Sequence, residues 1–234
     1  MNDAPIGVFD SGVGGISTLS ACLDLLPSES FVYLADRSGM PYGSKSHDEI
    51  ESRVGVCVET LLGEGVKAIV VACNTATNVG IAALRERYSL PFVGVEPAVK
   101  PAAIACRKGN ILVLSTPATA AQEKFARLIE RYDNGRIIIA PQPTLAEKTE
   151  RHIDNLEAIR RDVYDILSRY RNVEGVVLGC THYSFLKGII SDFYGGKIKI
   201  FDSSEGAARR LVYILDTYSL RAENSRNFIK FEVI

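Results

Sequence analysis

Two short runs far apart in the chain share one pattern that could do chemistry. They are Val70-Val71-Ala72-Cys73-Asn74-Thr75 and Val177-Leu178-Gly179-Cys180-Thr181-His182. An apolar stretch, a small residue, a cysteine and two polar side chains are typical of a buried strand that ends by presenting a thiol at a strand-to-helix turn. The cysteines lie about one domain length apart. One thiol from each half could therefore face the other across a cleft, which suits removal of a proton from one side of a carbon and its replacement on the other.

A plainer interpretation stands beside this one, because free cysteine often acts as a small buried hydrophobe. The two runs differ from a buried structural cysteine because hydrogen-bonding residues follow each of the two cysteines immediately. Cys22, Cys57 and Cys106 lack such followers and are assigned to packing. His182 is either a structural histidine or a proton partner for the thiol two residues before it.

Composition indicates a soluble globular protein of one large or two ordinary domains. The chain has 234 residues, 47% hydrophobic and 24% charged, with a net charge of −1. The near-neutral charge gives no ground for a nucleic-acid partner, and the longest apolar runs are too short to span a membrane. The N-terminal residues show no secretory signal. Five widely spaced cysteines do not form a disulfide framework, so we expect a protein of the reducing cytoplasm. Cysteine and histidine spacings predict no metal site, and we expect no cofactor.

Short apolar runs alternate with amphipathic ones, which predicts a mainly parallel sheet with helices on both faces. Helical spacing is clear over 48–62 and 153–170. We prefer two doubly wound α/β domains to an eight-stranded barrel, which usually needs about 250 residues. The predicted domains are 1–96 plus about 204–234, and 97–203. The tail over 228–234 could add an edge strand or hang loose. Strands are expected over 6–9, 31–35, 68–72, 92–95, 111–114, 136–140, 175–178 and 198–201.

A glycine-rich turn, Asp10-Ser11-Gly12-Val13-Gly14-Gly15, follows the first expected strand. It resembles a dinucleotide fingerprint only weakly, because Ser17 stands at the third glycine position and Asp10 would repel a pyrophosphate. We favour an open turn that brings Asp10 and Ser11 to the mouth of the sheet while backbone N–H groups hold a small anion. A tight turn and a helix cap are the structural alternatives.

Two further loops are candidates because each follows an expected strand at the edge where ligands bind in α/β folds. The first contains Pro41, Tyr42 and Gly43, a segment that could equally be a plain turn. The second contains Thr116 and Thr119, which could supply hydroxyls to a ligand or cap the next helix.

Taken together, these motifs resemble those of the glutamate racemases in the aspartate/glutamate racemase superfamily. The resemblance implies a cofactor-independent, two-base racemase of two α/β domains related by pseudo-twofold symmetry, which interconverts L- and D-glutamate for peptidoglycan. Cys73 would exchange the α-proton with the D-enantiomer and Cys180 with the L-enantiomer, assisted by Asp10 and His182. The matching pieces are Asp10–Gly15, Pro41–Gly43, Ala72–Ala76, Gly94–Ala98, Gly179–Tyr183 and Asp202-Ser203.

The resemblance also implies binding roles and contains departures. The glutamate that follows a family Cys-Pro pair is present as Glu150, a further catalytic candidate, but Gln142 replaces that cysteine and Ser184 a common proline. The alternatives are a racemase of another acidic amino acid such as aspartate, or a racemase-fold binding or regulatory protein. The partner would be an amino-acid substrate, and a homodimer is possible. The expected substrate-binding residues are Ser11, Pro41, Tyr42, Gly43, Asn74, Thr75, Thr116, Thr119 and Thr181.

Overall fold

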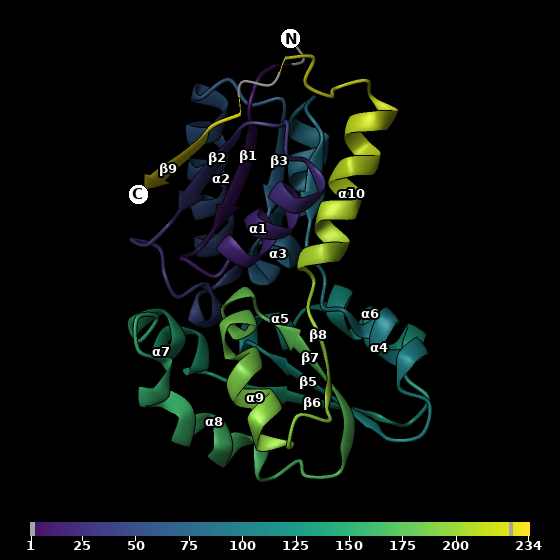
Figure 1. The fold of residues 1–234 in the computed structure, drawn as a ribbon. Helices are drawn as coiled ribbons and strands as arrows, with labels where there is room; N and C mark the ends of the chain where they lie inside the picture. The colour runs from purple at the N-terminus through teal and green to yellow at the C-terminus, as the bar shows by residue number, and fades with distance from the viewer. Residues whose placement is uncertain (1–2, 225–226) are drawn as a thin grey trace.

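A computed structural model describes residues 3–224 and 227–234 and contains two parallel sheets, one above the other in Figure 1. Sheet A has the strand order β4-β3-β1-β2-β9, and all of its pairings are parallel. The expected strands of the first half are confirmed, and the tail adds the edge strand β9. The strands of sheet A are β1 (Ile6–Asp10), β2 (Phe31–Ala35), β3 (Ala68–Val71), β4 (Phe92–Gly94) and β9 (Ile229–Val233).

Sheet B repeats the arrangement of sheet A. Its order is β6-β5-β7-β8, again all parallel. In chain order within each half, the spatial order is second, first, third and fourth strand, with β9 added outside the second strand of sheet A. This shared topology is what a pseudo-twofold relation between the halves requires. The strands of sheet B are β5 (Asn110–Ser115), β6 (Ile137–Pro141), β7 (Val173–Gly179) and β8 (Lys199–Phe201).

Helices cover both faces of each sheet, so the doubly wound fold class is confirmed. On sheet A, α1 (Ile16–Leu25) and α10 (Ser204–Thr217) pack on one face, and α2 (His47–Gly63) and α3 (Asn74–Arg87) on the other. On sheet B, α4 and α6 share one core with β5, while α8 and α9 share another. The helices of the second half are α4 (Val99–Ala105), α5 (Pro117–Ala120), α6 (Glu123–Tyr132), α7 (Leu145–Arg151), α8 (Arg160–Leu167) and α9 (Lys187–Phe193).

The helix expected over 48–62 is confirmed as α2, whose start is fixed by a capping box between Ser46 and Glu49. The single helix expected over 153–170 is wrong. The segment instead holds a 3₁₀ turn, η2 (Leu156–Ile159), followed by α8, and α8 ends at Leu167. Apolar residues three apart suit a 3₁₀ turn as well as an α-helix, so spacing alone could not separate the two.

The chain passes between the halves twice, from β4 to α4 and from β8 to α10. The second passage brings α10 back onto α1, where Leu211 and Leu215 are fully buried against sheet A. The exact domain boundaries stay a prediction, and residues 1–2 and 225–226 of the first predicted domain lie outside the described residues.

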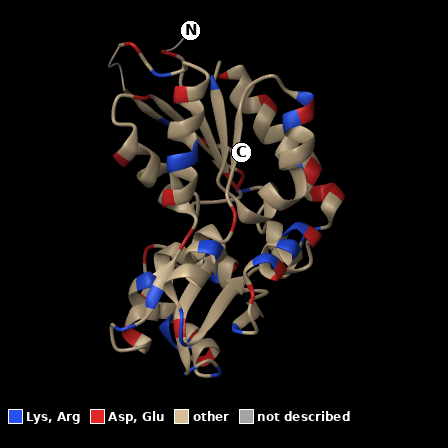
Figure 2. Cartoon of the chain, turned by 90° about the vertical axis from the view of Figure 1, so that its right-hand side faces the viewer, with Lys and Arg blue, Asp and Glu red and all other residues tan. Residues whose placement is uncertain are grey.

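Charged residues of both signs are interspersed over the outer helices of both halves (Figure 2). Within the described residues, no helix combines the length and the hydropathy needed to cross a bilayer.

Candidate active site

A cavity lies between the carboxyl ends of the two sheets, and both halves contribute to its wall. Its free volume is about 20 Å³, which is enough for about one water molecule. The structure is therefore of a closed state. The cavity is lined by Ser11, Met40, Pro41, Tyr42, Gly43, Cys73, Asn74, Thr75, Thr116, Gln142, Pro143, Ala146, Glu147, Cys180, Thr181 and His182.

Cys73 stands between the end of β3 and the first residue of α3 and is 5% exposed. Its sulfur lies 3.8 Å from the Ser11 hydroxyl. Burial, and next the charge of Asp10, raise the pKa of the Cys73 thiol. In the closed site this cysteine is therefore a thiol, able to give a proton rather than to take one.

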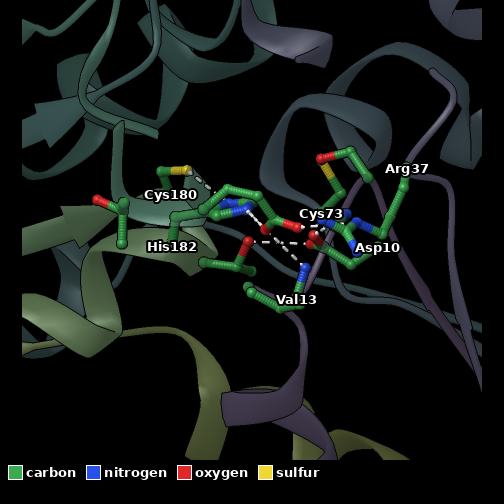
Figure 3. Close-up of polar contacts among 12 residues, drawn as sticks. Asp10, Val13, Arg37, Cys73, Cys180 and His182 are labelled. Carbon is green, nitrogen blue, oxygen red and sulfur yellow. Dashed lines mark hydrogen bonds and ion pairs between the residues drawn. The ribbon is translucent and has the colours of Figure 1, made fainter. Parts of the chain in front are cut away.

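Cys180 occupies the matching position of the second half, between β7 and the 3₁₀ helix η3 (Thr181–Leu186), and is 8% exposed. Its sulfur lies 3.8 Å from Nδ1 of His182, and Nε2 of the same ring lies 2.8 Å from a Glu150 oxygen (Figure 3). The structure thus arranges Cys180, His182 and Glu150 in a line.

The charges of this line follow from its hydrogen bonds. Burial disfavours a charged His182, but its hydrogen bonds with Cys180 and Glu150 outweigh burial and raise its pKa. Burial likewise disfavours the Glu150 carboxylate, but bonds from His182 and the Val13 N–H lower its pKa. The pair is therefore an imidazolium and a carboxylate at neutral pH. A cationic His182 can donate its Nδ1–H to the Cys180 sulfur and compensate a negative charge there.

Glu150 also joins the two halves. The backbone N–H of Val13, in the glycine-rich turn, donates to Glu150 Oε2 at 2.9 Å, and Arg37 Nε lies 3.6 Å from Oε1 (Figure 3). The turn was expected to hold a small anion, and the anion in this structure is the carboxylate of Glu150. The Tyr33 hydroxyl fixes the turn by donating to the Gly12 carbonyl at 2.7 Å.

Asp10 is fully buried behind the cavity. One of its oxygens accepts from the Thr181 hydroxyl at 2.9 Å and the other from the Gly12 N–H at 3.0 Å. Burial raises the pKa of Asp10, although nearby His182 and these two bonds oppose the rise. Asp10 and Thr181 come from opposite halves, so their bond also closes the site.

Gly14 makes this close approach of the halves possible. A Cβ at Gly14 would collide with the Thr181 hydroxyl and lie 2.7 Å from His182 Nδ1. Any larger residue would push the second half, and with it the Cys180–His182 pair, away from Asp10.

Three threonine hydroxyls meet across the cleft. Thr75 Oγ1 lies 3.2 Å from both Thr116 Oγ1 and Thr119 Oγ1, and the Thr116 and Thr119 oxygens are 3.0 Å apart. Thr116 lines the cavity and also caps α5 by accepting from the Thr119 N–H. Thr119, expected to bind substrate, is fully buried and is not among the lining residues, so it supports the other two hydroxyls from behind.

Asn74 is the most telling lining residue because its amide is unused. It is 2% exposed, and neither its Oδ1 nor its Nδ2 has a hydrogen-bond partner among the described residues. A buried amide without a partner costs free energy, so a polar ligand group is the expected occupant of the space that it faces.

Tyr42 lies on the cavity wall, but its hydroxyl does not face a ligand. The hydroxyl donates to Asp36 at 2.6 Å, and Arg53 Nε donates to the same oxygen at 2.8 Å. Burial disfavours the Asp36 carboxylate, but the bonds from Arg53 and Tyr42 lower its pKa. Tyr42 therefore anchors the loop that carries Pro41 and Gly43 instead of binding through its hydroxyl.

Sequence reasoning missed several residues of the site. Four unexpected residues line the cavity: Gln142, Pro143, Ala146 and Glu147. Gln142-Pro143 appears in the sequence only as a departure from the family pattern, and Glu147 precedes Glu150 by one helical turn. Met40, at the start of the candidate loop that contains Pro41, lines the cavity as well. Arg37, Asp36 and Arg53 act from outside the wall and follow from no motif. Within the described part of the chain, no group of three His, Cys, Asp or Glu residues could hold a metal ion.

The comparisons with known proteins agree with this geometry. Residues 15–211 match the sequence profile of the Asp/Glu/Hydantoin racemase family. The chain is 41% identical over 229 residues to a glutamate racemase of Clostridium botulinum strain Kyoto, which covers 97% of this chain and 89% of that one.

Solved structures give the same result. Glutamate racemase isoform RacE1 from Bacillus anthracis has a TM-score of 0.88 at 32% identity, covering 100% of this chain and 89% of that chain. Escherichia coli glutamate racemase, solved with L-glutamate and an activator, has a TM-score of 0.87 at 31% identity, covering 97% and 88%. The resemblance indicated by the motifs is confirmed: the chain belongs to the Asp/Glu/Hydantoin racemase family.

Proposed function

We propose that this chain is a glutamate racemase that inverts the α-carbon with two thiols and no cofactor. The observation that carries the proposal is the placement of Cys73 and Cys180 on one closed cavity, each at the end of the third strand of its half. Two thiols on opposite walls can hold a carbon acid between them. The names of the similar proteins support glutamate as the substrate.

One thiolate takes the α-proton while the opposite thiol supplies another. In the direction from L to D, the Cys180 thiolate removes the proton, and the C–H electrons remain on the α-carbon. Cys73 then donates its S–H proton to the opposite face of that carbon and becomes a thiolate. His182, held cationic by Glu150, compensates charge on the Cys180 sulfur, and Asp10 assists Cys73 in the reverse direction.

The α-proton of an amino acid is a weak acid, so the carbanion-like transition state must be stabilised by groups that are already oriented. The unpartnered Asn74 amide and the hydroxyls of Ser11, Thr75, Thr116 and Thr181 are the proposed ligands of the carboxylates and the ammonium. The backbone around Gly43 completes the wall. Closure excludes water and strengthens each of these interactions.

We further propose that the D-glutamate produced serves peptidoglycan synthesis in the cytoplasm, and that the protein acts as a homodimer. These proposals are supported by the family membership.

The decisive experiment incubates the purified, chelator-dialysed protein with L-glutamate in D2O. We expect loss of optical activity together with deuterium at the α-carbon, which mass spectrometry or NMR detects. L-Aspartate and other amino acids run in parallel, and a faster exchange with one of these would replace glutamate as the substrate. Exchange that disappears on dialysis and returns only with a metal ion or pyridoxal phosphate would refute the cofactor-independent mechanism.

A further inference from the structure

The edge strand β9 exposes an apolar strip. Ile229, Phe231 and Val233 alternate along one face of the strand and are 44%, 59% and 62% exposed. The Phe231 ring lies 5.8 Å from that of Tyr33, and Ile229 lines a shallow pocket with Leu23. Within the described residues β9 pairs only with β2, and Figure 1 shows it at the outer edge of sheet A. An exposed apolar edge strand is a template for pairing with another chain.

The hydrogen bonds of β9 show which backbone groups are free. The Phe228 carbonyl accepts from Phe31 N–H, and the Ile234 N–H donates to the Ala35 carbonyl. Backbone groups alternate in direction along a strand, so the even-numbered residues of β9 face β2. The N–H and C=O groups of Ile229, Phe231 and Val233 therefore point to the open edge.

The charges of β9 make the strand complementary to a second copy of itself in only one of the three central registers. A two-fold antiparallel pair centred on Phe231 sets Lys230 opposite the partner's Glu232 and lets every outward backbone group find a partner. Centring on Lys230 would oppose two lysines, and centring on Glu232 would oppose two glutamates. The side chains of Lys230 and Glu232 are 44% and 35% exposed and lie 2.8 Å apart. Lys230 also pairs with Glu64 of the same chain at 2.8 Å, and the partner's Glu232 adds a further carboxylate to this group. In the Phe231 register they occupy non-hydrogen-bonded pairs, where side chains come closest.

We propose that two copies of this chain associate through β9 in the antiparallel register centred on Phe231. Sheet A then continues across a two-fold axis into the sheet of the partner. Ile229 lies opposite the partner's Val233 and Phe231 opposite the partner's Phe231, so the apolar strips of the two copies lie side by side and pack against each other laterally. The contact is a short one compared with standard interfaces of about 1,600 Å², so the dimer dissociates on dilution.

Cysteine cross-linking tests the register directly, because the native cysteines are all buried. Lys230→Cys and Glu232→Cys are prepared as separate variants and oxidised alone or mixed. Opposite residues of a non-hydrogen-bonded pair lie about 4.5 Å apart at Cα, within reach of a disulfide. We expect a cross-linked dimer only in the mixture. A cross-linked dimer of either variant alone would identify another register. Absence of a cross-link from both single variants and from the mixture would overturn the proposal.

Analytical ultracentrifugation of the intact protein gives the second readout. Lys230→Glu places like charges opposite each other twice per dimer, and we expect the dissociation constant to rise about tenfold. The swap Lys230→Glu/Glu232→Lys restores both pairs, and we expect it to return the constant to near the wild-type value. Phe231→Asp should give a monomer. Ile104→Asp is the matched control, because Ile104 on α4 is 60% exposed and lies away from β9 in the sequence, and this variant should still form the dimer. A wild-type monomer at all concentrations, or a dimer indifferent to Lys230→Glu, contradicts the proposal.

Discussion

Replacing Glu150 with glutamine removes one charge from the Cys180–His182–Glu150 line and keeps the shape of the side chain. Gln can still accept from the Val13 N–H and from the His182 ring, but it offers no charge to the buried imidazolium. The pKa of His182 should therefore fall from its raised value of about 10, because only the Cys180 bond and the charges of Cys180 and Asp10 then oppose burial. A larger share of the ring would be neutral at pH 8.

The size of the effect follows from the role of the ring. A neutral His182 no longer compensates charge on the Cys180 sulfur, and a correctly protonated acid or base is typically worth 10²- to 10⁴-fold in rate. We therefore expect kcat/KM at pH 8 to fall by about that factor in both directions equally, because the equilibrium constant between enantiomers is one. Residual activity should rise as the pH falls toward 6 and the ring regains its proton.

Stability should change with its own pH dependence. The lowered pKa of Glu150 stabilises the fold above about pH 4.5, and this contribution is lost as the pH falls through its folded value. The raised pKa of His182 stabilises the fold fully below about pH 6.5, and this contribution is lost as the pH rises through about 10. The variant should therefore be less stable by about 1–3 kcal/mol between pH 5 and 6.5, and the difference should shrink toward pH 10.

NMR of the imidazole signals, urea denaturation and racemisation rates measure the three effects. Glu174→Gln is the matched control. Like Glu150, Glu174 accepts from backbone N–H groups and pairs with a cation, here Lys199, but it lies at the opposite end of β7. This variant should leave the rate unchanged. A Glu150→Gln protein with an unshifted His182 pKa and wild-type kcat/KM would refute the reasoning.

Further substitutions probe other parts of the site. Cys73→Ser and Cys180→Ser should each abolish racemisation while costing about 1 kcal/mol in stability; wild-type turnover by either folded variant would exclude the two-thiol mechanism. Asn74→Ala should weaken glutamate binding by about tenfold without lowering the melting temperature, because its amide has no hydrogen-bond partner among the described residues; calorimetry and thermal melts test this, and unchanged binding would count against it. Arg53→Met should destabilise the fold by about 3–5 kcal/mol by leaving a buried charge, and Asp36→Asn in the same chain should recover most of the loss in urea titrations; no recovery would show that the pair itself is not responsible.

Much of the fold was predictable, because the central strands are short apolar runs of the kind that parallel sheets bury on both faces. The predicted strand over 68–72 is β3 itself, with its end one residue earlier. The wrong prediction of a single helix over 153–170 rests on the same signal as the correct predictions. The spacing of apolar residues shows which side of a segment faces the core, but it does not distinguish a 3₁₀ turn from an α-helix. The cysteines were found because polar residues follow them directly.

The contacts that hold the catalytic side chains in place were harder to predict, because they join segments that are distant in the sequence. Glu150 meets Val13 and His182, and Asp10 meets Thr181 from the other half. No local pattern encodes such pairings. Tyr42 shows the converse case, since this residue of a family motif turns its hydroxyl toward Asp36 and not into the cavity.

The narrow cavity also protects the chemistry that it contains. Glutamate is much larger than the single water that fits there, so the halves must part around the two connections, after β4 and before α10, to admit each molecule. The same seal keeps oxidants and alkylating reagents from the sulfurs while the halves are together. Oxidation or alkylation of the two cysteines is thereby confined to the open state, in which substrate and product exchange. Saturation with substrate should therefore protect both cysteines from these reagents.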